Sequence, residues 1–309
     1  MSNVLVTGGA GFIGRHLVVA LLDKGHQVSV IDNKIEFPVK GRAEWYKHDI
    51  CGQKRIFQML LNGVDIIYHL AAIPNVQKSW QIPEKVHNVN ATGTLNVLLN
   101  ALAAGVKRVV YASSSSVYGD TETLPKREDM PVMPLSPYAV SKLAGENYCN
   151  AYNGHDGKNG NILTTVCLRY FNVYGKGQSP DSAAVIPSML RAYQNNEVAT
   201  IYGDGNQTRD FTYVKDVVNG TIRAGESNCT GVYNIGGGNR YSINDLTNYL
   251  SMTTGKYPSE VKYTDRRPGD ILDSYADISK AKRDFGYIPD FNLENGLHDM
   301  TQEDHGQEK

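Results

Sequence analysis

The feature that most constrains this chain is a glycine-rich turn near the N-terminus, between a short apolar run and an amphipathic segment. Residues 4–7 are apolar and too few for a helix, so they predict a buried parallel strand. The turn GGAGFIG follows at 8–14, and residues 15–24 have apolar side chains at helical spacing. A second predicted strand, 27–31, ends at Asp32. This order predicts the start of a dinucleotide-binding α/β fold.

Three glycines and one carboxylate in this unit have separate expected roles. Gly8 permits the tight turn, Gly11 lets a pyrophosphate approach the helix N-terminus, and Gly14 lets the helix pack close to the strand. Asp32 stands where a carboxylate can bond a ribose hydroxyl and would repel a 2′-phosphate. A glycine pattern alone is a weak signal, but the complete unit predicts a dinucleotide site and favours NAD over NADP.

Strands and helices alternate strictly through the first half of the chain. Such alternation predicts a doubly wound parallel sheet, whose strands bring their carboxyl ends to one edge. His69, at the end of one of these strands, is expected to be a structural histidine. The further predicted strands are 45–48, 65–70, 107–112 and 163–168, and the predicted helices are 51–61, 83–104 and 137–153.

Tyr138 and Lys142 lie one turn apart in a segment that should begin a helix. Ser136 is a good N-cap and Pro137 suits the first helical position, so both side chains share one face. An ammonium beside a phenol favours the phenolate, which brings an acid/base toward neutral pH. The serine cluster 113–116 follows a predicted strand and could share a substrate oxygen with the tyrosine. Taken alone, a Tyr and a Lys four residues apart are more often ordinary neighbours on a helix, and a serine cluster after a strand is often no more than a polar loop.

Composition disfavours several classes of function. The 309 residues include 31 Lys and Arg against 32 Asp and Glu, so charge gives no sign of a nucleic-acid or membrane partner. The four cysteines show no metal-binding spacing, and we expect free thiols and no metal. No targeting segment is recognisable and no apolar run approaches ~18 residues, so we expect a cytoplasmic protein without a membrane span.

The second half of the chain is less regular, and the family resemblance given below implies that it forms a smaller mixed α/β domain for the substrate. We expect a Rossmann-type NAD-binding domain formed by 1–171 and about 210–235. The substrate domain would consist of 172–209 and 236–309. The predicted helices of this half are 185–194, 214–225, 242–253 and 279–285.

Together these motifs resemble the extended short-chain dehydrogenase/reductases. The general markers are a glycine turn, a serine and a Tyr-x-x-x-Lys pair, at 8–14, Ser114, Tyr138 and Lys142. The nucleotide-sugar branch is marked by LRYFNVYG at 168–175, YGDGNQTRDF at 202–211 and RPGD at 267–270. The resemblance covers about residues 3–298 and is strongest to UDP-galactose and UDP-N-acetylglucosamine 4-epimerases.

The resemblance implies a role for each matching residue. Tyr138 would be the acid/base, Lys142 would lower its pKa and bond the nicotinamide ribose, and Ser114 would hold the substrate oxygen. The implied contacts of a tightly bound NAD are Gly8, Gly11, Phe12, Ile13, Gly14, Asp32, Asn33, Asp49, Ile50, Leu70, Ala71, Ala72 and Asn90, with Tyr138 and Lys142. The implied UDP-sugar contacts are Ser114, Ser116, Tyr138, Asn172, Val185, Tyr202, Arg209, Arg267, Asp270 and Ser274. Arg209 and Arg267 would hold the diphosphate, because guanidinium forks suit phosphate oxygens.

The implied activity is NAD-dependent 4-epimerisation of a UDP-hexose through a transient 4-keto sugar. A 4,6-dehydratase of the same family would have Asp-Glu where Ser115 and Ser116 stand, which disfavours dehydration. UDP-glucuronate epimerases and decarboxylases need a partner for a carboxylate, and the sequence offers no firm candidate. A NAD-sensing regulator on this fold typically loses the Tyr/Lys pair, which this chain keeps.

Two positions in the resemblance bear on the sugar, and two helices bear on assembly. Ser274 matches the residue that gates the sugar pocket, and its small side chain should admit an acetamido group. Pro74 lies in a segment where UDP-galactose epimerases often have a lysine, which leaves the sugar-side contacts open. Helices 83–104 and 137–153 resemble the pair that forms a four-helix interface in this family, which implies a homodimer.

Overall fold

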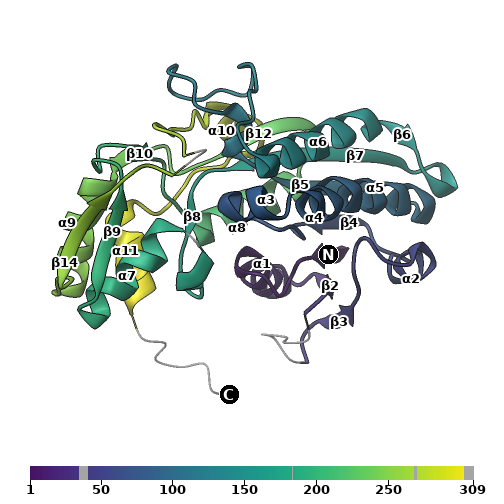
Figure 1. Ribbon diagram of the computed structural model, residues 1–309. Coiled ribbons are helices and arrows are strands. Elements are labelled where there is room, and N and C mark those ends of the chain that lie inside the picture. Colours follow the sequence, from purple (N-terminus) through teal and green to yellow (C-terminus); the bar gives the residue numbers. More distant parts are fainter. Residues whose placement is uncertain (35–40, 183, 268–269, 303–309) are drawn as a thin grey trace.

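The computed structural model describes residues 1–34, 41–182, 184–267 and 270–302 (Figure 1). Two residues of the predicted arginine motif, Pro268 and Gly269, lie outside the described residues. The helices are α1 (Phe12–Asp23), α2 (Lys54–Leu60), α3 (Val76–Gln81), α4 (Pro83–His87), α5 (Gly93–Ala104), α6 (Pro137–Tyr152), α7 (Val185–Asn195), α8 (Val214–Glu226), α9 (Ile243–Thr254), α10 (Ser279–Phe285) and α11 (Leu293–Thr301). The strands are β1 (Asn3–Thr7), β2 (Gln27–Asp32), β3 (Glu44–Lys47), β4 (Ile66–His69), β5 (Arg108–Ser114), β6 (His155–Asp156), β7 (Ile162–Tyr170), β8 (Val173–Tyr174), β9 (Val198–Tyr202), β10 (Thr208–Arg209), β11 (Thr212–Tyr213), β12 (Gly231–Ile235), β13 (Tyr241–Ser242) and β14 (Glu260–Thr264).

A large parallel sheet organises the N-terminal half. Its strand order is β3-β2-β1-β4-β5-β7-β12, and β6 adds a short antiparallel pair to β7. Val4 and Val6 face one core cluster while Leu5 faces the other, as the alternation of side chains along a strand requires. The neighbours along this path are parallel, so their carboxyl ends meet at one edge. The predicted doubly wound, Rossmann-type fold is confirmed.

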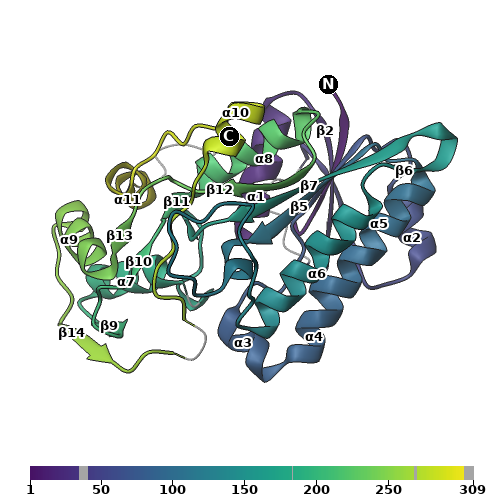
Figure 2. The same cartoon turned by 90° about the horizontal axis from the view of Figure 1, so that it is seen from above.

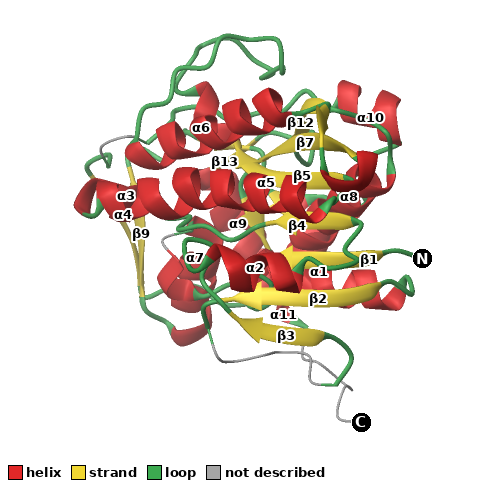
Figure 3. Cartoon of the chain, turned by 90° about the vertical axis from the view of Figure 1, so that its right-hand side faces the viewer, coloured by secondary structure: helices red, strands yellow, loops and turns green. Residues whose placement is uncertain are grey.

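Two helical layers cover the faces of this sheet (Figures 2 and 3). On one face α5 packs between α2 and α6, and on the other face α1 packs against α8. The inner face of α6 presents Tyr138, Lys142, Glu146 and Cys149, all buried at helical spacing. Among the described residues, no helix is long and apolar enough to cross a membrane.

The C-terminal half forms a smaller lobe beside the large sheet (Figure 1). In this lobe β9 pairs with β14, α7 packs on α9, and α9 packs on α11. Within the second half, α8 and β12 return to the large sheet. In addition α10, which belongs to the predicted substrate domain 236–309, packs against β12 and α8. The domain division itself stays a prediction.

The structure breaks the predicted helix 83–104 with a π turn at Asn88–Thr92. Within the turn, the side-chain amide of Asn90 bonds both the N–H and the C=O of Ile73, at 2.8 and 3.1 Å. The Thr94 hydroxyl donates to the Asn90 carbonyl oxygen at 2.6 Å. The contacts of Asn90 with Ile73, which lies 17 residues earlier, favour the wider turn, and helical periodicity alone could not predict them. The elements α3, α11 and β14 also had no counterpart in the sequence prediction.

Asp210 joins two loops of the smaller lobe to the turn that follows β10. Its buried carboxylate accepts hydrogen bonds from the backbone amides of Gly237 at 2.6 Å, Gly238 at 3.2 Å and Ala276 at 3.1 Å. Because Ala276 lies two residues after Ser274, this carboxylate also fixes the segment that carries the predicted sugar gate.

Asp210→Ala should lower the free energy of unfolding by about 3–5 kcal/mol, because two buried N–H groups and one partly buried N–H group lose their acceptor. Urea denaturation followed by circular dichroism measures this loss. Asp23→Ala is the control, since it removes an exposed carboxylate paired with Arg42 and should cost less than about 1 kcal/mol. Equal losses in the two variants would contradict the anchoring role of Asp210.

Candidate active site

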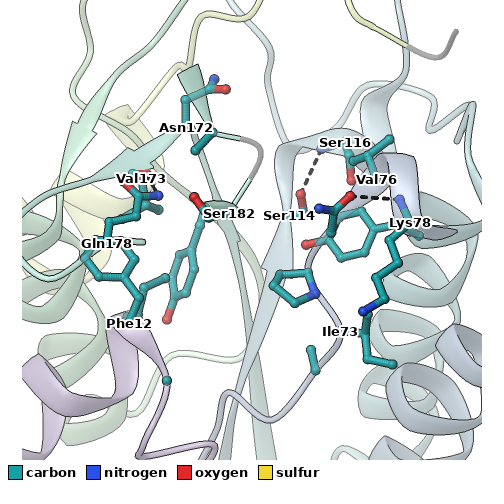
Figure 4. Close-up of a pocket in the computed structure, with 18 of the residues that line it drawn as sticks. Phe12, Ile73, Val76, Lys78, Ser114, Ser116, Asn172, Val173, Gln178 and Ser182 are labelled. Atoms are coloured by element: carbon teal, nitrogen blue, oxygen red, sulfur yellow. Dashed lines mark hydrogen bonds between the residues drawn. The ribbon is translucent and has the colours of Figure 1, made fainter. Parts of the chain in front are cut away.

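A cavity of about 1300 Å³ runs from the glycine turn along the ends of β4 and β5 into the smaller lobe. It contains the residues predicted to contact cofactor or substrate, with the exception of Asn90. Ser114 and Ser116 lie on one side of this cavity, and Phe12 and Gln178 lie on the other (Figure 4). The fold therefore brings together residues that are up to 266 positions apart, from Gly8 to Ser274.

The glycine turn lets the start of α1 pack closely on the end of β1 and on the chain that follows β4, at one end of the cavity. Gly8 has φ +74°, and a Cβ there would lie 2.6 Å from the amide nitrogen of Ala71. A Cβ at Gly14 would lie 2.2 Å from the carbonyl oxygen of Gly8. Helix α1 begins at Phe12, and the described residues provide neither a side-chain cap at Gly11 nor an acid in the first turn. The helix N-terminus is therefore available to an anionic group such as a diphosphate.

Backbone amides orient two carboxylates at the far end of the glycine turn. Asp32 accepts hydrogen bonds from the Ala10 and Lys34 amides, each at 3.0 Å, one on each oxygen. Asp49 accepts one from the Cys51 amide at 2.8 Å. Each oxygen of Asp32 keeps a second acceptor position, which suits a pair of ribose hydroxyls.

The ends of β5 and α6 bring Ser114, Tyr138 and Lys142 together. Ser136 caps α6 as predicted, because its hydroxyl accepts a hydrogen bond from the Ala139 amide. Tyr138 is only 8 % exposed and lies close enough to Ser114, the last residue of β5, for the serine hydroxyl to affect its pKa. Lys142 is 4 % exposed and lies one turn further along the same face of α6.

The electrostatics of this pair correct one prediction. Burial raises the pKa of the Tyr138 phenol above its usual value, and the neighbouring Ser114 hydroxyl only partly opposes this rise. Burial also lowers the pKa of Lys142 to about 8. The Lys142 ammonium donates to the carbonyl oxygen of Ala112 at 2.7 Å and lies 5.1 Å from the ring centroid of Tyr111. Desolvation therefore dominates the pKa of Tyr138, and the expected lowering by Lys142 is not found.

Asn90 and His69 lie behind the cavity wall. The Asn90 side chain bonds the backbone of Ile73 and the Ser141 hydroxyl, the latter at 3.0 Å, and so supports the wall, while its contact with a cofactor stays a prediction. Each ring nitrogen of His69 bonds a threonine hydroxyl, and burial lowers the pKa of the ring to about 3. His69 is a satisfied structural histidine, as expected.

Two arginines meet at the lobe end of the cavity. The Arg267 guanidinium lies 3.5 Å from the ring centroid of Tyr202, and Arg209 donates to two backbone carbonyl oxygens at 2.9 and 3.0 Å. Burial raises the pKa of Asp270, and both arginines oppose that rise. Neither guanidinium forms an ion pair with a carboxylate of the described residues. Their charge is therefore available to a diphosphate.

Small polar side chains line the middle of the cavity. Asn172 donates to the Ser274 hydroxyl at 3.4 Å, and Ser274 is 5 % exposed. Ser114 accepts a hydrogen bond from the Ser116 amide at 3.2 Å (Figure 4). The Ser116 hydroxyl is buried without a hydrogen-bond partner among the described residues. A ligand with several hydroxyl or amide groups would satisfy this surface.

Two glutamines that the sequence analysis did not name as site residues also line the cavity. Gln178 donates to the Val173 carbonyl oxygen at 3.1 Å, and Gln207 donates to that of Tyr202. The Oε1 atom of each glutamine is buried and finds no donor within the described part of the chain. Gln207 lies inside the predicted 202–211 motif and could have been found there, whereas Gln178 lies in a loop that no motif marked.

These residues fit NAD by their chemistry and shape. The cradle at Gly8 and Gly14 has no space for a Cβ, the N-terminus of α1 suits a diphosphate, and Asp32 suits an adenosine ribose. The same cavity continues past Ser114 and Tyr138 to the two arginines. In the described residues, no group of three His, Cys, Asp or Glu side chains could hold a metal ion.

The chain is similar to known proteins over nearly its whole length. It is 36% identical over 308 residues to UDP-glucose 4-epimerase of Mycolicibacterium smegmatis, covering 96% of each chain. It is 32% identical over 307 residues to UDP-glucuronic acid decarboxylase 1 of Danio rerio, covering 97% of this chain and 72% of that protein.

Solved structures show the same fold. UDP-N-acetylglucosamine 4-epimerase from Methanobrevibacter ruminantium, in complex with UDP-N-acetylmuramic acid, has a TM-score of 0.88 and 36% identity, and the match covers 97% of this chain and 96% of that one. UDP-glucuronic acid 4-epimerase from Bacillus cereus, in complex with UDP-glucuronic acid and NAD, has a TM-score of 0.87 and 35% identity, with coverage of 96% and 97%.

A family model also matches residues 4–236, a stretch that includes the glycine turn, Ser114, Tyr138, Lys142 and Arg209. The dependence on NAD and the UDP-sugar ligands of the solved relatives agree with the cavity described above. The chain belongs to the NAD-dependent epimerase/dehydratase family, and its cofactor is NAD.

Proposed function

We propose that this protein interconverts the C4 epimers of a UDP-hexose. The observation that carries the proposal is the placement of Ser114 and Tyr138 together in one cavity, between the glycine turn and the arginines Arg209 and Arg267. An acid/base located between a dinucleotide site and a diphosphate site suits oxidation and reduction of a sugar that is held by its nucleotide. The similarity to the UDP-glucose 4-epimerase of Mycolicibacterium smegmatis also supports this proposal.

In the proposed reaction, each protein side chain acts on the sugar 4-oxygen or supports a group that does. NAD, when held at the glycine turn and Asp32, would supply reversible hydride transfer at C4. Tyr138 takes the proton of the 4-hydroxyl and later gives it back, while Ser114 holds the oxygen. Because burial opposes the phenolate, the positive charge of Lys142 has to favour it in the working complex.

The arginines would hold the part of the substrate that does not react. Arg209 and Arg267 lie at the lobe end of the cavity, so their contact with the diphosphate fixes UDP while the hexose stays free to turn. The binding energy thus comes from contacts with UDP and not from contacts near C4. The 4-keto sugar can therefore turn and present its opposite face.

Tyr138→Phe should lower turnover of UDP-glucose by about 10³-fold, because the ring stays in place while the proton-carrying oxygen is lost. Turnover is measured by separating UDP-glucose from UDP-galactose, and bound NAD is measured after denaturation. NAD content should remain at the wild-type level. Tyr152→Phe, at the last residue of α6, is the control and should keep wild-type turnover. Turnover of Tyr138→Phe within 10-fold of wild type would contradict the assignment.

We also propose that the sugar pocket admits an N-acetyl group. Ser274 lines the cavity beside Asn172, and the unpaired hydroxyl of Ser116 lies in the same cavity. A small residue at this gate leaves space for an acetamido group. The solved UDP-N-acetylglucosamine 4-epimerase from Methanobrevibacter ruminantium supports this reading.

Ser274→Tyr should lower kcat/KM for UDP-N-acetylglucosamine by about 10–200-fold while UDP-glucose is nearly unaffected, because the phenol would fill the space of the acetamido group. The control Ser279→Tyr places the same side chain on the exposed start of α10 and should leave both substrates unaffected. An unchanged ratio of the two kcat/KM values in Ser274→Tyr would contradict the gate.

UDP-glucuronate is a second candidate substrate. The likeness to the Bacillus cereus enzyme in complex with UDP-glucuronic acid and NAD favours it. Assays with UDP-glucose, UDP-N-acetylglucosamine and UDP-glucuronate, without added NAD, separate the alternatives. A C4 epimer supports an epimerase of that sugar, loss of carbon dioxide supports a decarboxylase, and no product with any of them supports a NAD-sensing regulator.

We propose further that the protein forms a homodimer through α4–α5 and α6. The side chains of Trp80, in α3 just before α4, and of Val140, on α6, are exposed, which supports an apolar contact between copies along these helices. A single species of monomer mass in sedimentation velocity at micromolar concentration would contradict it.

A further inference from the structure

A buried polar network lies behind the catalytic pair and begins on the catalytic helix itself. Glu146 follows Lys142 by one turn of α6 and Tyr138 by two turns, so the three side chains share the face that packs on the sheet. The side chain of Glu146 is only 4 % exposed. The proposed reaction does not use it, although it is a charged group within two turns of the acid/base.

Glu146 is held by two different strands. Both of its oxygens accept hydrogen bonds from Arg169 of β7, from Nε at 2.9 Å and from Nη2 at 2.8 Å. The Ser113 hydroxyl of β5 donates to the same carboxylate. Ser113 is the residue immediately before Ser114, and Lys142 donates to the carbonyl oxygen of the preceding residue, Ala112. Lys142 and Glu146, neighbours on the inner face of α6, are therefore fixed to Ala112 and Ser113, the two residues of β5 that precede Ser114.

The register of the sheet places these groups side by side. Ser113 lies opposite Arg169 in the pairing of β5 with β7, and Arg169 lies opposite Asn234 in the pairing of β7 with β12. The Ser113 hydroxyl, the Arg169 guanidinium and the Asn234 amide therefore belong to directly opposed residues on three neighbouring strands. The network depends on this register, because a shift by one residue would turn each side chain to the other face.

The same network extends to the sugar side of the cavity. Arg169 stacks on the ring of Tyr118, with its guanidinium carbon 4.5 Å from the centroid. The Tyr118 hydroxyl donates to Asn234 at 2.6 Å, and the Asn234 amide donates to the carbonyl oxygens of Lys126 at 2.9 Å and Asp277 at 3.1 Å. Asp277 lies three residues after Ser274. The network thus joins the acid/base helix to the segment that carries the predicted sugar gate.

We propose that Glu146 and Arg169 are positioning residues, which fix Tyr138 and Ser114 relative to each other and to the sugar wall. The inference rests on the proposed function, because it assumes that Tyr138 and Ser114 act on the sugar. A buried ion pair is weak evidence for stability, since the cost of desolvating two charges offsets their attraction. The loss of alignment by about 1 Å, in contrast, can cost a reaction about 10²-fold. The geometry therefore points to alignment as the role of the pair.

The test replaces the pair by apolar residues of similar length, in the double variant Glu146→Met with Arg169→Met. This variant should fold with wild-type or higher stability. Its kcat for UDP-glucose should fall by about 10–100-fold, while KM stays within about 3-fold and bound NAD is unchanged. A second, milder variant, Ser113→Ala, should lower kcat by at least about 3-fold at unchanged melting temperature, and Ser113→Thr should restore it because the hydroxyl returns.

The control Arg108→Met removes a buried arginine from the opposite end of β5, where Arg108 bonds the carbonyl oxygens of Ala224 and Cys229. It should lower stability and leave kcat unchanged. Wild-type kcat in a folded double variant would show that the positioning role is wrong. If the double variant does not fold, wild-type kcat in Ser113→Ala would show the same. That result would leave the proposed function intact, whereas wild-type turnover by Tyr138→Phe would overturn the function itself.

Discussion

Pairing of β5 with β7 is the interaction on which the active site depends. Seven residues of each strand lie in register, from Arg108 opposite Thr164 to Ser114 opposite Tyr170. This pairing forms the floor on which α6 packs, and it sets where Ser114 ends relative to Tyr138 on that helix. The neighbouring parallel strands then bring the glycine turn to the same edge of the sheet. The cavity is a consequence of this arrangement.

Burial has two opposite effects at this site. It disfavours the charged form of Tyr138, Lys142 and Arg209 alike, because each of them loses water. It also strengthens the attraction of these groups for a ligand of opposite charge, because the surroundings have a low dielectric constant. Under the proposed function, a buried guanidinium gains its partner when a diphosphate binds.

The sequence predicted those parts of the site that local rules determine. The glycine turn, the start of α6 at Pro137 and the end of β2 at Asp32 depend on backbone sterics and capping, and they lie where predicted. Other features depend on contacts between distant segments, so periodicity could not show them. The π turn arises from the bonds of Asn90 to Ile73, and the network around Glu146 requires the register of three strands. The pKa of Tyr138 depends on how deeply the fold buries it, which no motif records.

The central claim is that one hydride leaves C4 and returns to the same carbon. UDP-glucose with deuterium at C4 tests it most directly, followed by mass spectrometry and NMR of the nucleotide sugars after incubation with the purified protein and no added NAD. The account predicts UDP-galactose that retains deuterium at C4, with no hydrogen from solvent at that position. Loss of the deuterium to solvent, or a product that has lost water or carbon dioxide, would contradict it.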